Sequence, residues 1–309
     1  MLFLGVKEFD VTRLEDYMLA NKKMARFGMK YLDDRLGGIL RGDLILIGAR
    51  SGAGKSTIAE IIATANSRIG KKVTLISLEN FKDDNFVQKA YYKYKELTKQ
   101  WGLTLRDFAS GDFERDAFAI VECEKFAENE YKNISMVNRS KDFTIEDLKE
   151  ALVRAVEDEN SDLVIVDHID YLDKESGVSD NEHITSLMRE IRAAQYAFKI
   201  PVVAISHLRK VVSSKAEIIV PSMDEFVGSS NKVKEATCVI MLAPNDEENV
   251  LNNSPIKSTW CCVRKLRMGG IDNKVAKVYF DQRQGVYVDR YELYGVNYAG
   301  TKVVPIYPK

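Results

Sequence analysis

The residues from Ala49 to Thr57 have the types and the spacing that can hold a phosphate group. Because Gly52, Ala53 and Gly54 carry little or no side chain, backbone N–H groups of this stretch can surround an anion. Lys55 can reach the β- and γ-phosphates of a nucleotide, and Ser56 can bind Mg²⁺. The predicted contacts to ATP are Ala49, Arg50, Ser51, Gly52, Ala53, Gly54, Lys55, Ser56 and Thr57.

The segments on either side of this motif predict how it is positioned. Residues 43–48 contain an apolar run that is long enough for a buried parallel strand and too short for a helix. A helix is expected to begin near Lys55 and to continue through residues 58–67, so that its positive dipole end points at the same anion. This order of strand, loop and helix is typical of a P-loop and disfavours a chance match in a glycine-rich turn.

Three further polar side chains stand at the ends of apolar runs that read as strands. Glu79 follows residues 73–78, Asp167 ends residues 162–167, and His207 follows residues 200–206. Ligands bind at the carboxyl edge of open α/β sheets, so we expect all three at the nucleotide, with the 73–78 strand beside the P-loop strand. Glu79 can polarise the attacking water, Asp167 can hold Mg²⁺ together with Ser56, and His207 can contact the γ-phosphate. An ordinary strand-end side chain is the alternative for Glu79 and His207.

The rest of the chain reads as one large domain with an arm. Residues 1–26 are expected to form an N-terminal arm whose helical stretch lies either on its own domain or on a neighbouring subunit. Residues 27–309 are expected to form the α/β domain, with residues 83–135 as helices outside the sheet. The tyrosines of that helical segment are expected to pack on its own helices rather than stack on bases. Further strands are expected at 134–137, 236–242 and 260–265, helices at 144–157 and 183–198, and a terminal hairpin at 274–280 and 285–288.

Composition and charge limit the classes of protein that fit. The chain has 309 residues with 45 Lys and Arg against 46 Asp and Glu, so nucleic-acid binding must depend on a local group of cations. No apolar run is long enough for a membrane span, and the N-terminus does not resemble a secretory signal. The four cysteines have no CxxC spacing and the three histidines lie far apart, which disfavours a zinc site. These features fit a reduced, cytoplasmic compartment.

A long connection after His207 carries several cations. Residues 209–231 have no strong periodicity, and connections of this length are often functional. A basic segment that leaves the nucleotide edge can contact the phosphates of single-stranded DNA, although a solvated surface loop is the alternative. The candidate DNA contacts are Arg209, Lys210, Lys215, Lys232 and Lys234.

The order of these landmarks resembles a known family. The stretches GILRGDLILIGARSGAGKST, LISLE, LVIVDHIDYL, VVAISHLRK and VRKLRMGG resemble the RecA-like ATPase domain of hexameric replicative DNA helicases. The resemblance spans about residues 27–288. It includes the bacterial DnaB type, and the VDH and SHL stretches are more similar to phage helicase–primases and mitochondrial Twinkle.

The resemblance implies roles for particular residues. It implies that Glu79 is the catalytic carboxylate, that Asp167 is the Walker B acid and that His207 senses the γ-phosphate. Lys265 and Arg267 match a pair that reaches into the neighbouring subunit's site, with Arg267 as arginine finger, and Phe280 stands where relatives stack an aromatic ring on adenine. The implied partners are single-stranded DNA, further copies of the chain in a ring, taken as a hexamer, and a primase or loader. Where relatives carry an Arg-Gly pair in a central loop, this chain has residues 227–230, VGSS.

The sequence therefore predicts a RecA-like P-loop core with a mostly parallel sheet flanked by helices and a C-terminal β-hairpin. It predicts an ATP- and Mg²⁺-dependent helicase motor that translocates on single-stranded DNA. One alternative is a non-helicase DNA-dependent ATPase of the same fold, of the recombinase or packaging kind. Another is an accessory subunit that binds nucleotide without hydrolysing it, which the intact set Lys55, Glu79, Asp167 and Arg267 disfavours.

Overall fold

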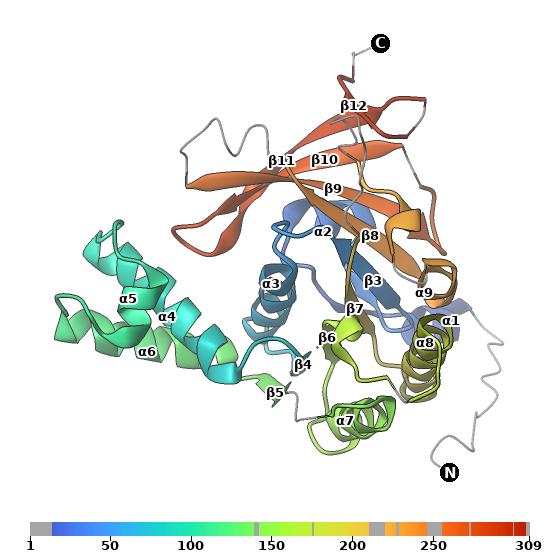
Figure 1. The fold of residues 1–309 in the computed structure, drawn as a ribbon, viewed down its shortest axis with the longest axis horizontal. Helices are drawn as coiled ribbons and strands as arrows, with labels where there is room; N and C mark the ends of the chain where they lie inside the picture. Colours follow the sequence, from blue (N-terminus) through green and yellow to red (C-terminus); the bar gives the residue numbers. More distant parts are fainter. Residues whose placement is uncertain are drawn as a thin grey trace.

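A long twisted sheet organises the protein. The computed structural model describes residues 14–138, 142–174, 176–209, 220–226, 229–245, 255–271, 273–298 and 300–306. Within these residues ten strands form one sheet in the order β12-β11-β10-β9-β8-β3-β7-β6-β4-β5, which runs from top to bottom in Figure 1. They are β3 (Leu44–Ala49), β4 (Val73–Ser77), β5 (Ile134–Asn138), β6 (Leu163–Asp167), β7 (Val202–His207), β8 (Cys238–Pro244), β9 (Ile256–Leu266), β10 (Lys274–Asp281), β11 (Val286–Val296) and β12 (Val303–Val304).

The sheet has two halves with different pairing. The strands from β5 to β8 are parallel to their neighbours, whereas β8, β9, β10, β11 and β12 pair antiparallel in succession. The predicted α/β class with a mostly parallel sheet and a C-terminal hairpin is therefore confirmed. The hairpin is longer than expected, because β11 extends to Val296 and β12 adds one more strand to it.

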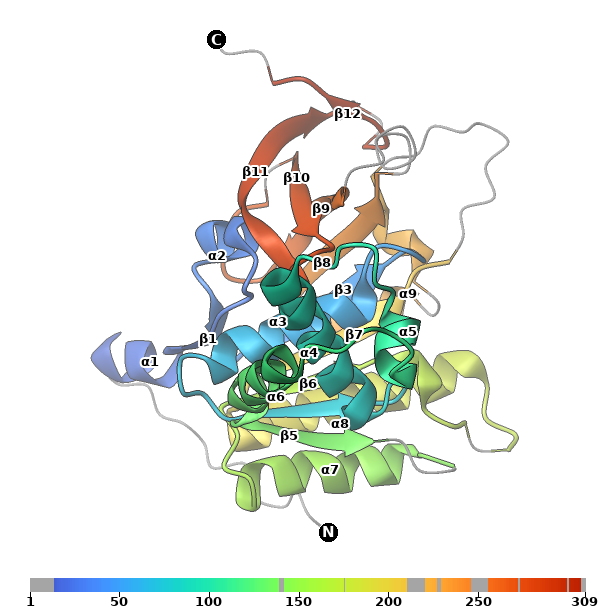
Figure 2. The ribbon, with the colours of Figure 1, turned by 90° about the vertical axis from the view of Figure 1, so that its left-hand side faces the viewer.

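Helices cover both faces of the parallel half. On one face lie α2 (Lys30–Leu36) and α3 (Lys55–Ser67); on the other lie α7 (Ile145–Glu157), α8 (Asp180–Phe198) and α9 (Ser229–Glu235). In Figure 2, α3 lies above β4 and β5, and α7 lies below them. Short elements complete the fold: α1 (Leu14–Ala20), β1 (Lys23–Ala25), β2 (Ile39–Leu40), and the 3-10 helices η1 (Ile169–Tyr171) and η2 (Met223–Glu225).

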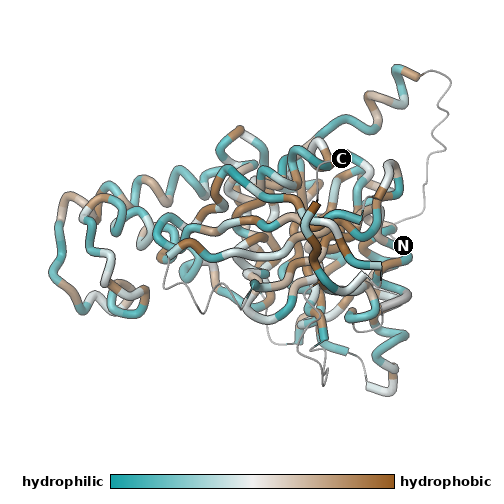
Figure 3. Tube along the Cα trace, turned by 90° about the horizontal axis from the view of Figure 1, so that it is seen from above, coloured by the Kyte–Doolittle hydropathy of each residue, from teal (hydrophilic) through white to brown (hydrophobic). Residues whose placement is uncertain are grey.

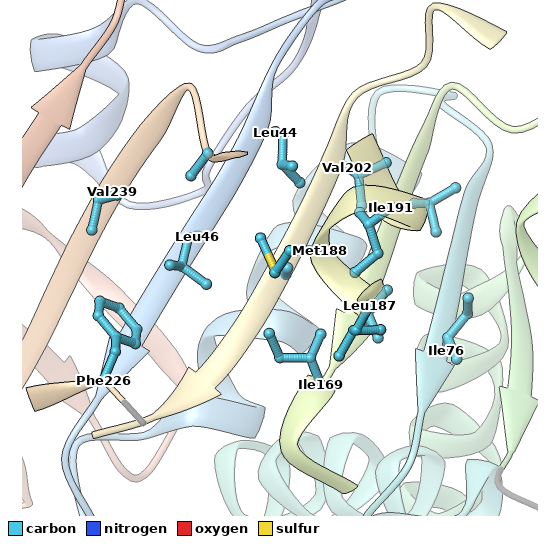
Figure 4. Close-up of a cluster of buried hydrophobic side chains, with 14 of the residues drawn as sticks. Leu44, Leu46, Ile76, Ile169, Leu187, Met188, Ile191, Val202, Phe226 and Val239 are labelled. Atoms are coloured by element: carbon cyan, nitrogen blue, oxygen red, sulfur yellow. The ribbon is translucent and has the colours of Figure 1, made fainter. Parts of the chain in front are cut away.

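Alternating side chains along β3 explain why both faces are covered. Leu44 and Leu46 point into one hydrophobic core, and Ile45 and Ile47 point into the other. Figure 4 shows Leu44 and Leu46 facing Met188 and its neighbours on α8. Each such fully buried aliphatic side chain contributes about 1.5–3 kcal/mol. Figure 3 shows the apolar stretches concentrated in the central strands.

Three helices project from the body of the protein (Figure 1). They are α4 (Lys82–Thr98), α5 (Leu105–Ser110) and α6 (Ala117–Tyr131), which confirms helices outside the sheet in this part of the chain. They share a small separate core that includes Tyr94, Cys123 and Ala127. Tyr94 is fully buried and the Tyr91 hydroxyl donates to the carbonyl of Leu103, so these tyrosines pack within the helices, as expected.

The order of the strands differs from one expectation. The strand before Glu79 is not beside the P-loop strand, because β7 and β6 lie between β3 and β4. Those two strands are apolar on both faces and therefore fill positions inside the sheet. The predicted arm residues 23–25 form β1, which pairs with β2, and the arm residues 1–13 lie outside the described part of the chain. No helix in the described residues is long and apolar enough to cross a membrane.

Candidate active site

The P-loop turns directly from β3 into α3. Gly52 and Gly54 both have φ of 81°, a left-handed conformation that only glycine adopts without strain, and Gly54 is the N-cap of α3. The turn is closed by the N–H of Ala53, which donates to the carbonyl of Arg50 at 3.0 Å. The first residues of α3 are Lys55, Ser56 and Thr57, so their backbone N–H groups lack helical acceptors and can receive an anion.

The side chain of Arg50 is engaged elsewhere. Its Nε and Nη2 donate to Glu225 Oε2 and Oε1 at 2.8 and 2.7 Å, and Glu225 is buried. Such a paired geometry is among the stronger ion-pair arrangements. Arg50 therefore anchors the P-loop to η2.

The structure brings Ser56 and Asp167 together. Burial raises the pKa of the Asp167 carboxyl, and a hydrogen bond from Ser56 opposes this rise. Within the described residues, Asp167 Oδ1 is buried and has no hydrogen-bond partner. A hydroxyl and an unsatisfied carboxylate oxygen side by side are the hard oxygen ligands that Mg²⁺ prefers, so the two residues fit the predicted metal site.

Glu79 reaches the same site although its strand lies farther along the sheet. The N–H of Leu78 donates to the carbonyl of Asp167 at 2.7 Å, which holds the end of β4 against the end of β6. Glu79 is half-exposed, and its Oε2 lies 3.6 Å from Nε2 of the buried His168. The Glu79 carboxylate is thus placed beside Asp167 with access to water.

His207 completes this edge of the sheet. Its ring lies 4.2 Å from the ring of His168 in an edge-to-face arrangement. Burial, followed by the charges of His168 and Lys55, lowers the pKa of His207. A neutral imidazole therefore faces the P-loop lysine, and it can donate a hydrogen bond to a phosphate oxygen.

Behind His207 lies an ionic cluster that sequence reasoning missed. Asp170 Oδ1 accepts from Lys232 Nζ at 2.5 Å, and Asp170 Oδ2 accepts from the backbone N–H of His207 at 2.7 Å. Burial alone would raise the pKa of Asp170, but its contacts with His168 and Lys232 hold that pKa well below its usual value. His168 and Asp170 stood within a quoted motif, whereas no local signal marked Lys232 as their partner.

Lys232 corrects one prediction. Its side chain is fully buried and its ammonium also donates to Ser206 Oγ at 2.9 Å, so it is not available to DNA. Of the other candidate cations, Arg209 and Lys234 are exposed, and Lys210 and Lys215 lie outside the described residues, as do Val227 and Gly228. The N–H of Arg209 donates to the carbonyl of Glu225, which pins the start of this connection to η2.

Lys265 and Arg267 lie at the opposite edge of the sheet. The N–H of Arg267 donates to the carbonyl of Thr237, and the N–H of Thr237 donates to the carbonyl of Leu44, at the amino end of β3. The P-loop begins at the other end of this six-residue strand, about 17–20 Å away. Arg267 therefore cannot serve the P-loop of its own chain.

The amino edge concentrates positive charge. Burial, followed by the charge of Arg267, lowers the pKa of both Arg192 and Lys265. Arg267 is exposed, and no residue in the described part of the chain makes an ion pair with it. A cavity of about 740 Å³ adjoins it, lined among others by Tyr17 of α1 and Arg192 of α8. This edge is suited to an anionic surface or group from another molecule.

Phe280 lies toward the same edge of the sheet as the P-loop. In β10, Ala276 is level with Cys261, Leu242 and Ala49 across the sheet, and Phe280 lies four residues farther toward the carboxyl edge. Strand alternation puts it on the face that carries α3. Its ring is half-buried and lies 5.6 Å from that of Tyr287.

The chain matches a known protein family and is similar to solved structures. A family model described as the DnaB-like helicase C-terminal domain matches residues 25–289. A solved ATPase domain has a TM-score of 0.72 and 20% identity, over 89% of this chain and 95% of that one. A DnaB-like replicative helicase, whose structure was described with its interactions with primase, has a TM-score of 0.73 and 20% identity, over 92% of this chain and 68% of that one.

A more distant structure shares the fold. A KaiC-like protein from Pyrococcus horikoshii OT3 has a TM-score of 0.55 and 14% identity, over 87% of this chain and 99% of that one. No curated protein sequence matches the chain significantly.

Proposed function

This chain belongs to the DnaB-like helicase C-terminal domain family and is an ATP-dependent helicase, and we propose that it hydrolyses ATP between neighbouring copies of itself in a ring. The observation that carries this proposal is the separation of Lys55 and Arg267 by the length of β3. A head-to-tail contact would bring the amino edge of one copy to the carboxyl edge of the next. Repetition of that contact around a rotation axis closes a ring, which we take to be a hexamer.

In this arrangement each chain would bind the nucleotide mainly through its P-loop. Lys55 and the N-terminal amides of α3 would contact the β- and γ-phosphates, Ser56 and Asp167 would hold Mg²⁺, and Phe280 would pack on the base. When bound, the metal ion neutralises charge on the phosphate oxygens.

Glu79 would accept a proton from the attacking water, and His207 would hydrogen-bond to the γ-phosphate. Arg267 and Lys265 of the neighbour would stabilise the negative charge that develops on it.

We further propose single-stranded DNA as the polymer on which the ring moves. The connection that begins at Arg209 leaves the sheet next to His207, so a change at the γ-phosphate lies close to its base. Arg209, Lys210 and Lys215 would contact backbone phosphates, with Lys234 as a further candidate. The similar DnaB-like replicative helicase was described together with its interactions with primase. A primase is therefore a partner to test for this chain, alongside a loader.

A mixing experiment tests the shared active site. Lys55→Ala should abolish hydrolysis in its own P-loop but leave its finger intact, and Arg267→Ala should do the reverse. Mixed rings contain interfaces that pair an intact P-loop with an intact finger, so mixing two inactive variants should restore ATP turnover. Turnover is measured after energy transfer between differently labelled variants has shown that mixed rings form; absence of recovery in such rings would contradict the proposal. Unwinding of a forked duplex by the wild-type ring separates a helicase from the non-helicase ATPase.

A further inference from the structure

Helix α9 lies between the two edges of the sheet. It contains only residues Ser229–Glu235, and the chain passes from it through Thr237 into β8, at the level of the amino end of β3. Asn231 anchors it to α8, since its Nδ2 donates to Thr185 Oγ1 at 2.5 Å. The helix therefore has a fixed neighbour on one side, and its remaining ties point toward the two functional edges.

One tie joins α9 to the nucleotide edge. Lys232 extends its buried ammonium to Asp170 and Ser206, at 2.5 and 2.9 Å. Asp170 in turn accepts from the backbone N–H of His207, and it lies 3.3 Å from Nδ1 of His168, whose other ring nitrogen faces Glu79. Asp170 thus contacts the backbone of His207 directly and is connected to Glu79 through His168.

The other tie joins α9 to the finger. Lys265 Nζ donates to the carbonyls of Val233 and Lys234, at 2.6 and 3.1 Å. These carbonyls come directly after Lys232 in the chain, and Arg267 follows Lys265 by two residues on the same strand end. A displacement of Lys232 would therefore be carried to Lys265 through one or two peptide units.

We propose that α9, held by Lys232–Asp170 at its middle and by Lys265 at its carboxyl end, makes the position of the finger depend on the nucleotide state of its own subunit. This inference rests on the proposed ring with shared sites. It assigns Lys232 and Asp170 as positioning residues that touch neither nucleotide nor DNA. Loss of the γ-phosphate would release His207, shift Asp170 and α9, and change the presentation of Arg267 to the next subunit.

The burial of Lys232 supports a specific role. Moving an ammonium out of water is costly, and well-packed apolar residues often stabilise such a position as well or better. An ion pair, however, fixes direction and distance, whereas an apolar contact allows sliding. The pair therefore suits an element that must keep its register with His207.

The test measures how one inactive subunit affects its neighbours. Inactive Lys55→Ala subunits, which keep their finger, are mixed in increasing proportion into wild-type rings, and ATP turnover is measured without DNA so that the strand cannot couple the subunits. The same titration is made in rings whose subunits all carry Lys232→Met. The double variant Asp170→Asn/Lys232→Met replaces the pair by neutral groups and serves if the single variant folds poorly. Lys89→Met is the matched control, because it removes another buried lysine, paired with Glu60 at 3.1 Å.

The outcomes separate the inference from the proposed function. We expect turnover to fall faster than the inactive fraction rises in wild-type and Lys89→Met rings, and to fall in simple proportion in Lys232→Met or double-variant rings. An unchanged steep fall in both Lys232 variants would overturn the inference and leave shared hydrolysis intact. A proportional fall in wild-type rings would also overturn it. Turnover that does not need Arg267 would instead overturn the proposed function.

Discussion

The two edges of the parallel half of the sheet treat charge in different ways. At the carboxyl edge, Asp167, His168 and Lys232 are buried, and ionic groups face one another across short distances. At the amino edge, Arg267 is exposed beside Lys265 and Arg192, and the three cations repel one another. One edge is nearly complete within the chain, whereas at the other Glu235 and Asp43 offset only part of the positive charge.

This difference indicates what each edge requires for function. A site that binds nucleotide must hold its groups in place before the substrate arrives, so their burial and mutual contacts are useful. A group that acts in a neighbour must remain accessible and must not be neutralised within its own chain. The following predictions test this contrast, beginning with the largest expected effect.

Removal of the exposed cation at the amino edge should have a large effect on catalysis and little on the isolated chain. Arg267→Ala should lower ATP turnover by about 10³-fold, because a finger stabilises charge only in the transition state, while nucleotide affinity and thermal stability stay near wild type. Turnover and binding are compared by steady-state kinetics and fluorescent-nucleotide titration. Arg41→Ala, which changes another arginine near this edge, is the control. A large loss of nucleotide affinity or stability in Arg267→Ala would show that this edge is completed within the chain.

Neutralising Glu79 should have the next largest effect. Glu79→Gln keeps the size of the side chain but cannot accept a proton from water, so turnover should fall by about 10²-fold or more while ATP still binds. Glu146→Gln, an exposed change on α7, provides the comparison. Near-normal turnover in Glu79→Gln would move the role of base to another group at the carboxyl edge.

The cations of the connection after His207 should act on DNA rather than on ATP. Replacing Arg209, Lys210 and Lys215 with Ala should weaken binding of single strands of any sequence and remove DNA stimulation, while basal turnover persists. The slope of log affinity against log salt should become shallower by about 0.7 for each DNA phosphate that is no longer neutralised. A variant with Lys72, Lys125 and Lys132 changed to Ala loses equal charge elsewhere. An equal change of slope in that control would show that overall charge, not this connection, governs binding.

The smallest effect concerns the stability of the nucleotide-free protein. Burial raises the pKa of Asp167, so its ionisation opposes folding, and stability should fall as pH rises from the ordinary carboxyl range to the raised folded value. Asp167→Asn should lack this decline and gain roughly 1–3 kcal/mol at neutral pH, or about 2–8 °C in Tm, measured with chelator present. A lower Tm in this variant would mean that Asp167 is satisfied within the chain.

Local patterns predicted the local structure of the P-loop and of the strand ends. The P-loop and the strand-end residues Glu79, Asp167 and His207 depend on short stretches whose physics is local. The structure places Glu79, Asp167 and His207 at one edge with Lys55, as the rule for parallel strands requires. The P-loop helix begins at Lys55, where the motif placed it.

Long-range pairing could not be predicted in the same way. The predicted position of β4 beside β3 was wrong. Strand order depends on which later strands enter the sheet, not on adjacency in the chain. The local sequence around Lys232 predicts a surface cation. Its burial depends on its contact with Asp170, which lies 62 residues away in the chain. The pairing of Arg50 with Glu225 spans 175 residues and gives no local signal either.

The projecting helices are attached to the body of the protein by polar contacts with the P-loop helix and by the packing of Phe86 and Tyr131. Glu60 of α3 pairs with Lys89 of α4 and accepts from the Tyr131 hydroxyl at the end of α6, while Arg68, just past α3, pairs with Glu130. Their own core is small, so they should open by local unfolding, and exchange their amide hydrogens, more readily than the central strands. Because their base is attached to α3, a nucleotide that stabilises α3 should slow this exchange in α4 and α6, and mass spectrometry could then follow occupancy of the P-loop from helices outside the site.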